Sequence, residues 1–179
     1  MVTGVLPGIR KQGLHPPNAR VQNTRMKQLI AVIFGFLFAA SVLPAAELGT
    51  GIVEIRLASD PAKAIYAAKG KEVEVSSNHA SKFRLGPGLT DPQLMCFELV
   101  GAKKHYLRHR GFVLHLDENV KLNLLFNADS SFKVIHLDGD KVRFEASNYR
   151  DKFLAVIPAG GVVLIANPSP EQSTFVLKK

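Results

Sequence analysis

The sequence predicts an all-β fold made of three similar units, and three observations support this prediction. Apolar residues alternate with polar ones at a period of two, as in Val53, Ile55 and Leu57, which is the spacing of half-buried strands. Turn-forming pairs such as Asp60-Pro61 and Gly160-Gly161 separate these stretches. A polar stretch that ends in phenylalanine recurs along the chain. No stretch after residue 46 carries a sustained helical stripe, so we expect strands and turns throughout.

The repeated unit has a recognisable start and end. The opening apolar residues are Ile55, Phe97 and Phe144, and the closing residues are Phe83, Phe132 and Phe175. Four short strands fit into each unit at the spacing that is usual for all-β domains. Three four-stranded units that close on one another form a β-trefoil, in which closure removes exposed strand edges and builds a shared core. A β-sandwich is the alternative, but it gives no reason for a threefold repeat.

Residues 1–46 are predicted to be an N-terminal extension and signal peptide. The uncharged run Leu29–Leu43 has 15 residues, which suits a signal-peptide core, whereas a membrane span needs about 20. Lys27 precedes the run and small residues follow it at 45–46. We expect a secreted or periplasmic protein, with an uncleaved membrane anchor as the alternative. Met26 is an alternative start.

The folded domain is predicted to span residues 47–179 and to be only weakly basic. The chain has 23 basic and 15 acidic residues, and residues 1–46 contain five of the basic residues and none of the acids. A nucleic-acid-binding protein should keep a concentrated basic face, so that class is disfavoured. Cys96 is the single cysteine; no disulfide can form within the chain, and its apolar surroundings predict a buried side chain.

Two passages of the second unit are similar to those of a known family. They read Tyr106-Leu107-Arg108-His109-Arg110-Gly111-Phe112 and Asp129-Ser130-Ser131-Phe132. The unit resembles the arabinose-binding domain of α-L-arabinofuranosidase B, a β-trefoil carbohydrate-binding module that repeats the blocks Phe-Glu-Ser, Tyr-Leu-Arg-His-x-x-Phe and Asp-Ala-Thr-Phe. The resemblance spans about residues 50–179 and is strongest in the second unit.

The resemblance implies a shallow pocket for a terminal arabinofuranose, with a histidine and an aspartate as its central polar contacts. By position these are His109 and Asp129. A carboxylate can accept hydrogen bonds from two adjacent ring hydroxyls, and an imidazole can donate to another oxygen. Tyr106 is expected to line the pocket and Asn127 to add a polar contact, with a structural turn role as the alternative for Asn127. Phe112 is expected either beside the pocket or in the core.

Both central polar residues are replaced in the other units. In place of Arg108-His109 and of Asp129, the third unit has Ala155-Val156 and Gln172, and the first has roughly Ala67-Ala68 and Ala80. Glutamine can hydrogen-bond a hydroxyl without charge assistance, and alanine cannot. We therefore expect sugar binding mainly through the second unit. Arg108 is expected at the pocket rim or paired with an acid.

The sequence predicts binding without catalysis. Glycoside hydrolysis needs two carboxyl groups across the scissile bond, and no second acid has a repeat-based reason to face Asp129. We expect a monomer that binds the L-arabinofuranose side chains of plant-type polysaccharides such as arabinan and arabinoxylan. No metal, cofactor or nucleic acid is expected, and membrane contact only through the N-terminal segment. The alternative is a protein-interaction or acidic-polysaccharide-binding module that uses the basic cluster 103–110.

Overall fold

The computed structural model describes residues 51–121 and 123–179, and strands account for most of the regular structure in these ranges. The all-β prediction is confirmed. The predicted extension and signal peptide, residues 1–46, lie outside the described residues. In the part of the chain that is described, neither helix has the length and apolar character of a membrane span.

Each unit contributes four consecutive strands. The first unit has β1 (Ile52–Leu57), β2 (Asp60–Tyr66), β3 (Glu74–Ser76) and β4 (Lys82–Pro87). The second has β5 (Met95–Leu99), β6 (His105–Arg110), β7 (Val113–Glu118) and β8 (Phe132–His136), with helix α1 (Leu124–Asp129) before β8. The third has β9 (Lys141–Ala146), β10 (Lys152–Val156), β11 (Val162–Ala166) and β12 (Phe175–Lys178), with helix α2 (Pro170–Ser173) before β12.

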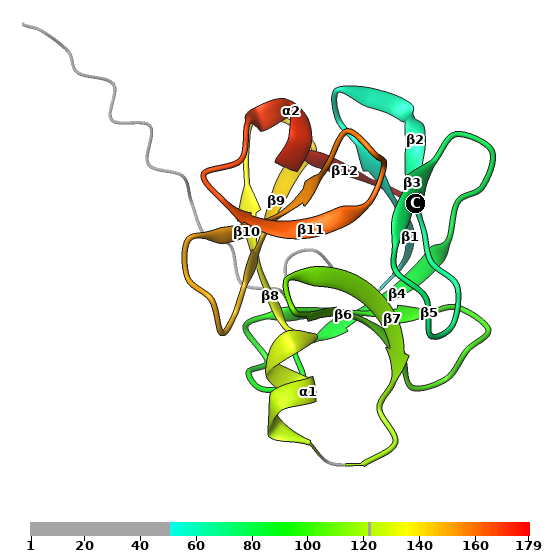
Figure 1. Ribbon diagram of the computed structural model, residues 1–179, viewed down its shortest axis with the longest axis vertical. Helices are drawn as coiled ribbons and strands as arrows, with labels where there is room; N and C mark the ends of the chain where they lie inside the picture. The colour runs from blue at the N-terminus through cyan, green and yellow to red at the C-terminus, as the bar shows by residue number, and fades with distance from the viewer. Residues whose placement is uncertain (1–50, 122) are drawn as a thin grey trace, which may run out of the picture. The chain divides into compact units, whose positions relative to one another are not determined.

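Six strands form a ring through antiparallel pairing. β1 pairs with β4, β4 with β5, β5 with β8, β8 with β9, β9 with β12, and β12 pairs back with β1. The remaining strands form the hairpins β2–β3, β6–β7 and β10–β11, one from each unit (Figure 1). Because each ring strand has partners on both sides, the ring does not present a free edge for pairing with another chain.

The opening and closing residues of the three units meet in the core. Ile55, Phe97 and Phe144, and likewise Phe83, Phe132 and Phe175, are all fully buried. The rings of Phe97 and Phe144 meet edge-on with centroids 5.2 Å apart, and those of Phe144 and Phe175 lie 5.6 Å apart. Buried aromatic rings supply a large part of a core's apolar area. The opening and closing residues of the repeat are therefore core residues.

Cys96 is buried beside this core, as predicted. Its Sγ donates to the carbonyl oxygen of Pro87 at 3.2 Å. Burial, with a smaller contribution from the negative charge of Glu98, raises the pKa of the thiol to about 11. The thiolate is the nucleophilic form, so Cys96 acts as a small apolar side chain.

Two short helices depart from the predicted strands and turns. Asn123 begins α1, because its Oδ1 accepts from the main-chain nitrogens of Leu125 and Phe126 at 2.9 and 3.2 Å. Such a cap satisfies donors that a helix start would otherwise leave unpaired. A helix of six residues is too short to show a repeated apolar stripe, and Phe126 is its one buried apolar residue. The sequence pattern therefore held no helical signal here.

Strand pairing also corrects the alignment of the first unit. The equivalent pairs between neighbouring strands are Arg56–Ala64, Glu98–Tyr106 and Glu145–Phe153. Counting onward from these pairs, Tyr66 takes the place of Arg108 and Ala67 the place of His109. The predicted assignment of Ala67-Ala68 is therefore off by one residue. The two residues of each pair are 8 positions apart in all three units, so an ungapped count along the sequence gives Ala67 as well.

Candidate functional site

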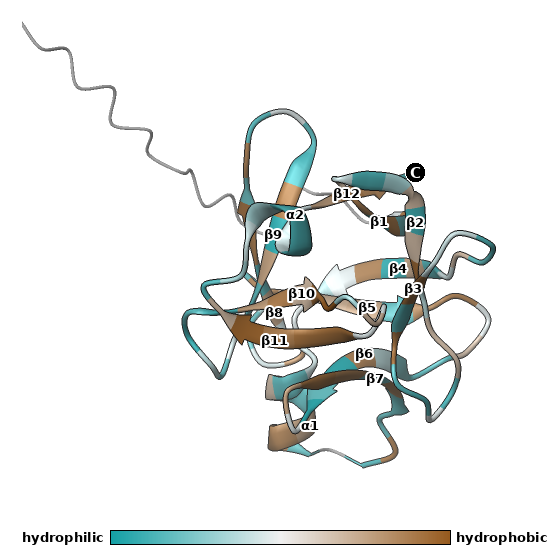
Figure 2. Ribbon diagram, turned by 45° about the horizontal axis from the view of Figure 1, so that its top comes forward, coloured by the Kyte–Doolittle hydropathy of each residue, from teal (hydrophilic) through white to brown (hydrophobic). Residues whose placement is uncertain are grey.

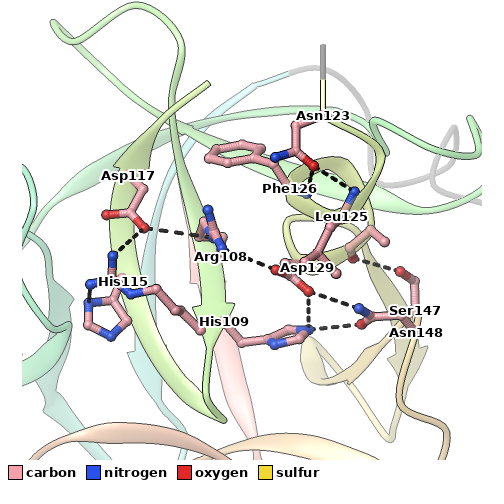
Figure 3. A network of polar contacts seen from close by, with 12 residues as sticks. Arg108, His109, His115, Asp117, Asn123, Leu125, Phe126, Asp129, Ser147 and Asn148 are labelled. Atoms are coloured by element: carbon pink, nitrogen blue, oxygen red, sulfur yellow. Dashed lines mark hydrogen bonds and ion pairs between the residues drawn. The ribbon is translucent and has the colours of Figure 1, made fainter. Parts of the chain in front are cut away.

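His109 and Asp129, the two central residues predicted for the sugar pocket, lie against each other. His109 stands on β6 and Asp129 ends α1. The Nε2 atom of His109 is 3.5 Å from Oδ1 of Asp129, and Figure 3 shows the two side chains pointing toward one another. They are only 2% and 5% exposed. The structure thus brings them together in a buried position.

Asn148, from the turn between β9 and β10, joins this pair. Its Nδ2 donates to Oδ1 of Asp129 at 2.8 Å, and its Oδ1 lies 2.8 Å from Nε2 of His109. An amide oxygen can only accept, so in this arrangement Nε2 of His109 carries the proton. Ser147 holds the same turn in place, because its hydroxyl donates to the carbonyl oxygen of Ala128 at 2.8 Å. A turn of the third unit therefore completes a cluster of the second.

Arg108 lies on the other side of the carboxylate. Its Nη2 donates to Oδ2 of Asp129 at 3.2 Å, and its Nε is 3.7 Å from Oδ2 of Asp117. Its guanidinium also lies over the Phe126 ring, 4.8 Å from the centroid. A buried charge needs an opposite charge and hydrogen bonds to offset its desolvation. Of the two places predicted for Arg108, pairing with an acid is the one found.

Asp129 has little hydrogen-bonding capacity left. An ionised carboxylate has about four acceptor positions. Arg108 and Asn148 donate to two of them, and Nε2 of His109, whose proton points to Asn148, lies close enough to Oδ1 at 3.5 Å to obstruct a third. We refer to His109, Asp129, Asn148 and Arg108 as the polar cluster. This cluster leaves room for about one further donor at the carboxylate.

Two aromatic side chains give the polar cluster an exposed border. The Tyr149 ring meets His109 edge-on with centroids 5.3 Å apart, and Phe112 meets Tyr149 at 5.0 Å. Tyr149 is 40% exposed and Phe112 41%, so the core-packing alternative for Phe112 is wrong. Phe112 has φ 66°, a conformation that bulky residues rarely adopt, and its turn presents the ring at the surface. The Nζ of Lys152 lies 5.0 Å from the Phe112 ring centroid.

Tyr106 and Asn127, also predicted as site residues, have other contacts. Side chains alternate along a strand, so Tyr106 lies on the opposite face of β6 from His109. Its ring packs edge-on against Phe126 with centroids 6.4 Å apart, and burial raises the pKa of its hydroxyl. The Oδ1 of Asn127 accepts from Nδ2 of Asn119 at 3.0 Å. Both contacts position α1, and a role in sugar contact stays a prediction.

The basic cluster 103–110 is not one continuous surface. His109 is buried and Arg108 is paired with acids, as described above. Arg110 has its Nη1 3.6 Å from Oδ2 of Asp117. Lys103 and Lys104 are exposed on the turn before β6. The arrangement does not favour the acidic-polysaccharide alternative, which needs these cations free together.

Comparison with protein families shows the family to which this chain belongs. Residues 59–172 match the alpha-L-arabinofuranosidase B (ABFB) domain. The chain belongs to this family. The matched range includes the whole second unit and most of the third, so the resemblance seen in the sequence is confirmed.

Several solved structures are similar in fold to this chain. An arabinofuranosidase complexed with arabinofuranosyl-alpha-1,2-xylobiose has 16% identity and a TM-score of 0.65, over 73% of this chain and 31% of that chain. A GH54 α-L-arabinofuranosidase soaked with a cyclic sulfate inhibitor has 16% identity and a TM-score of 0.66, over the same shares of the two chains. The designed 3-fold symmetric protein ThreeFoil has 13% identity and a TM-score of 0.52, over 72% of this chain and 98% of that chain.

This ABFB domain chain therefore spans about a third of the length of the arabinofuranosidases it matches. At this identity the likeness shows the fold. No curated protein sequence matches the chain significantly.

The third unit of the ABFB domain has different chemistry at the position of the polar cluster. Val156 stands in place of His109 and Gln172 in place of Asp129. They line a hollow of about 350 Å³. Its other lining residues include Leu57, Val75 and Ile157, together with the charged Lys63 and Glu171. In this unit, where the histidine and the aspartate are both replaced, the corresponding surface is mostly apolar.

Asn148 and Tyr149 are the contributors to the site that sequence reasoning missed. Both lie in the third unit but contact residues of the second, so a search within one unit could not find them. Counting from the strand pairs, Asn148 and Tyr149 take the places that Gly101 and Ala102 have in the second unit. The sequence did contain one signal: this turn has a polar and an aromatic residue, whereas the same turn of the second unit has two small residues.

Proposed function

We propose that this chain is a β-trefoil domain that binds the L-arabinofuranose side chains of polysaccharides such as arabinan and arabinoxylan. The family match supports the ligand class. The closed ring with three hairpins and the likeness to a 3-fold symmetric design support the trefoil. The observation that carries the proposal is the polar cluster bordered by two exposed aromatic rings, since flat rings and fixed hydrogen-bonding groups are what sugar recognition needs.

The two kinds of group have different tasks in this proposal. Phe112 and Tyr149 supply most of the contact area, because His109 and Asp129 are almost fully buried. The remaining acceptor of Asp129 takes a hydrogen bond from one sugar hydroxyl, and His109 and Asn148 hold the carboxylate in place for it. Such a small site typically binds weakly, with a Kd on the order of millimolar.

Binding occurs mainly in the second unit. The third unit lacks both the imidazole and the carboxylate at the corresponding positions, and the first has Ala67 and Ala80 there. Linked sites on one protein would raise the apparent affinity for a branched polymer. Because one unit binds, we expect the affinity for arabinan, counted per side chain, to be close to the affinity for a short oligosaccharide.

The domain acts by binding and not by hydrolysis. Asp129 is already engaged by Arg108 and Asn148, which suits a positioned acceptor better than a catalytic acid or nucleophile. We further propose a monomer that works outside the cytoplasm. Incubation with an aryl arabinofuranoside tests the first point, and steady release of the aryl group from pure protein would contradict it.

Calorimetric titration of the full-length protein with arabinofuranosyl-xylooligosaccharide, and with the undecorated xylooligosaccharide as the reference ligand, tests the binding. We expect binding of the decorated ligand alone. Tyr149→Ala changes an exposed residue and should weaken binding about tenfold, or about 1.4 kcal/mol. Gln172→Ala, at the place of Asp129 in the third unit, is the matched control and should bind as the unchanged protein does.

Two results would contradict the proposal. Absence of binding to every arabinofuranosyl ligand would contradict the proposed function. Equal losses of affinity in Tyr149→Ala and Gln172→Ala would show that binding is not confined to one unit. Binding that falls steeply above about 0.1 M salt would favour the acidic-polysaccharide alternative, because the screening length there is about 10 Å.

A further inference from the structure

The segment from the end of β7 to α1 exposes aliphatic side chains that the polar cluster does not use. Val120 is 72% exposed, Leu124 83% and Leu125 61%. Figure 1 shows α1 at one end of the domain, and Figure 2 shows hydrophobic residues on α1. The other exposed large aliphatic side chains among residues 51–121 and 123–179 are less than half exposed: Ile52, Val100 and Leu137.

This exposure is fixed by local structure. The side chain of Asn123 accepts from the nitrogens of both Leu125 and Phe126, and Phe126 is buried under Arg108 and beside Tyr106. With Phe126 facing inward, Leu124 and Leu125 face outward. Apolar surface that gathers in one place on a folded domain marks an interaction site more often than single exposed residues do.

Lysines lie around these aliphatic residues. Lys121 is exposed next to Val120, and Lys103 and Lys104 are exposed on the turn before β6. The main-chain nitrogen of Asn119 donates to the carbonyl oxygen of Lys104 at 2.9 Å, so the two segments are adjacent. One exposed acid, Glu118, lies near them on β7, at the position opposite His105 of β6. The surroundings of the aliphatic residues are therefore cationic.

We propose that this end of the domain docks on an anionic lipid surface. Val120, Leu124 and Leu125 enter the boundary between headgroups and acyl chains, where their apolar area leaves water. The lysine stems extend along the apolar region while the ammonium groups contact anionic headgroups. A second copy of the chain is a poorer partner, because face-to-face contact would bring the same lysines together and like charges repel.

The absence of tryptophan from the sequence makes a local test possible. The full-length Leu125→Trp variant has one tryptophan in the proposed contact. We expect its emission to shift to shorter wavelength, and brominated lipid to quench it, with vesicles of phosphatidylcholine and phosphatidylglycerol. Leu137→Trp, on the turn at the far end of β8 from α1, is the matched control and should not change. Because each signal is local, membrane binding elsewhere in the chain does not imitate it.

A charge variant tests the electrostatic part on the Leu125→Trp background. Lys121→Gln should lower the vesicle partition coefficient about fivefold, whereas Lys141→Gln, next to the β8–β9 turn, should leave it unchanged. No emission shift with anionic vesicles would overturn the proposal, and so would an equal shift in Leu137→Trp. A concentration-dependent shift without vesicles would show that a second copy covers the surface and would overturn it too. Arabinofuranosyl-ligand binding is measured separately and is independent of all these outcomes.

Discussion

The second and third units place different chemistry at the same point of the same strand framework. In the second unit His109 and Asp129 are buried in hydrogen bonds and ion pairs, and Asn148 reaches them from the neighbouring unit. In the third, Val156 and Gln172 line a hollow whose other lining residues are mostly apolar. The framework therefore sets where a site can form, and a few side chains decide what that site can hold.

The boundaries between units also differ in the side chains that cross them. Asn148 joins the third unit to the second through two side-chain hydrogen bonds to buried groups. Ser59 has the corresponding place in the first unit, and its hydroxyl donates to the carbonyl oxygen of Glu171 at 2.8 Å in an exposed position. Buried polar networks cost more to break than exposed hydrogen bonds. We expect the second–third boundary to depend more strongly on its side chains.

The largest expected effect comes from Asp129→Ala. The change leaves Arg108 and Asn148 without their shared acceptor in a buried place, so we expect the free energy of unfolding to fall by about 3 kcal/mol. Gln172→Ala, its counterpart in the third unit, should cost less than about 1 kcal/mol. Urea denaturation followed by circular dichroism measures both. Similar losses in the two variants would show that the polar cluster contributes no special stability.

Asn148→Ala should have a smaller effect. It removes one donor and one acceptor from the cluster but keeps the Arg108–Asp129 ion pair, so we expect a loss of about 2 kcal/mol. Ser59→Ala at the corresponding exposed turn should change stability by about 0.5 kcal/mol or less. The same denaturation experiment compares them. A larger loss in Ser59→Ala would reverse the order of the two boundaries.

The smallest effect concerns pH and His115, which lies opposite Arg108 on β7. Burial, followed by the positive charge of Arg110, lowers the pKa of His115 below its ordinary 6.5, while Asp117 and Glu72 act in the opposite direction. The unfolded chain then binds the proton more tightly. This contribution to stability is present above about pH 6.5 and is lost as the pH falls through the lower, folded-state pKa.

His115→Gln should therefore reduce the drop in unfolding free energy between pH 7 and pH 5. Counting along the paired strands places Val163 at the same position of the third unit. Val163→Gln is the control that should keep the pH dependence of the unchanged protein. An unaltered pH profile in His115→Gln would show that another group is responsible.

The core could be predicted from the sequence because it obeys the repeat. Phe97 and Phe144 open their units at matching positions, and both are fully buried. The proximity of His109 and Asp129 followed from matching two blocks of one unit to a known family. In each case the information lay within a single unit, and strand alternation or block spacing expressed it directly.

The rest of the site depends on contacts between units, which no pattern within one unit encodes. Asn148 and Tyr149 contact the second unit because the ring brings the β9–β10 turn beside α1. The helix itself is too short to leave a periodic signal, so only strands and turns were expected there.

The pairing of β1 with β12 sets the order in which the ring can form. Glu54 lies opposite Lys178 and Leu57 opposite Phe175, although β1 is the first and β12 the last of the twelve described strands. During synthesis, one edge of β1 therefore stays unpaired until the ribosome has added the residues up to β12. Nascent chains expose that edge until β12 has been made, and unpaired strand edges are prone to misassociate.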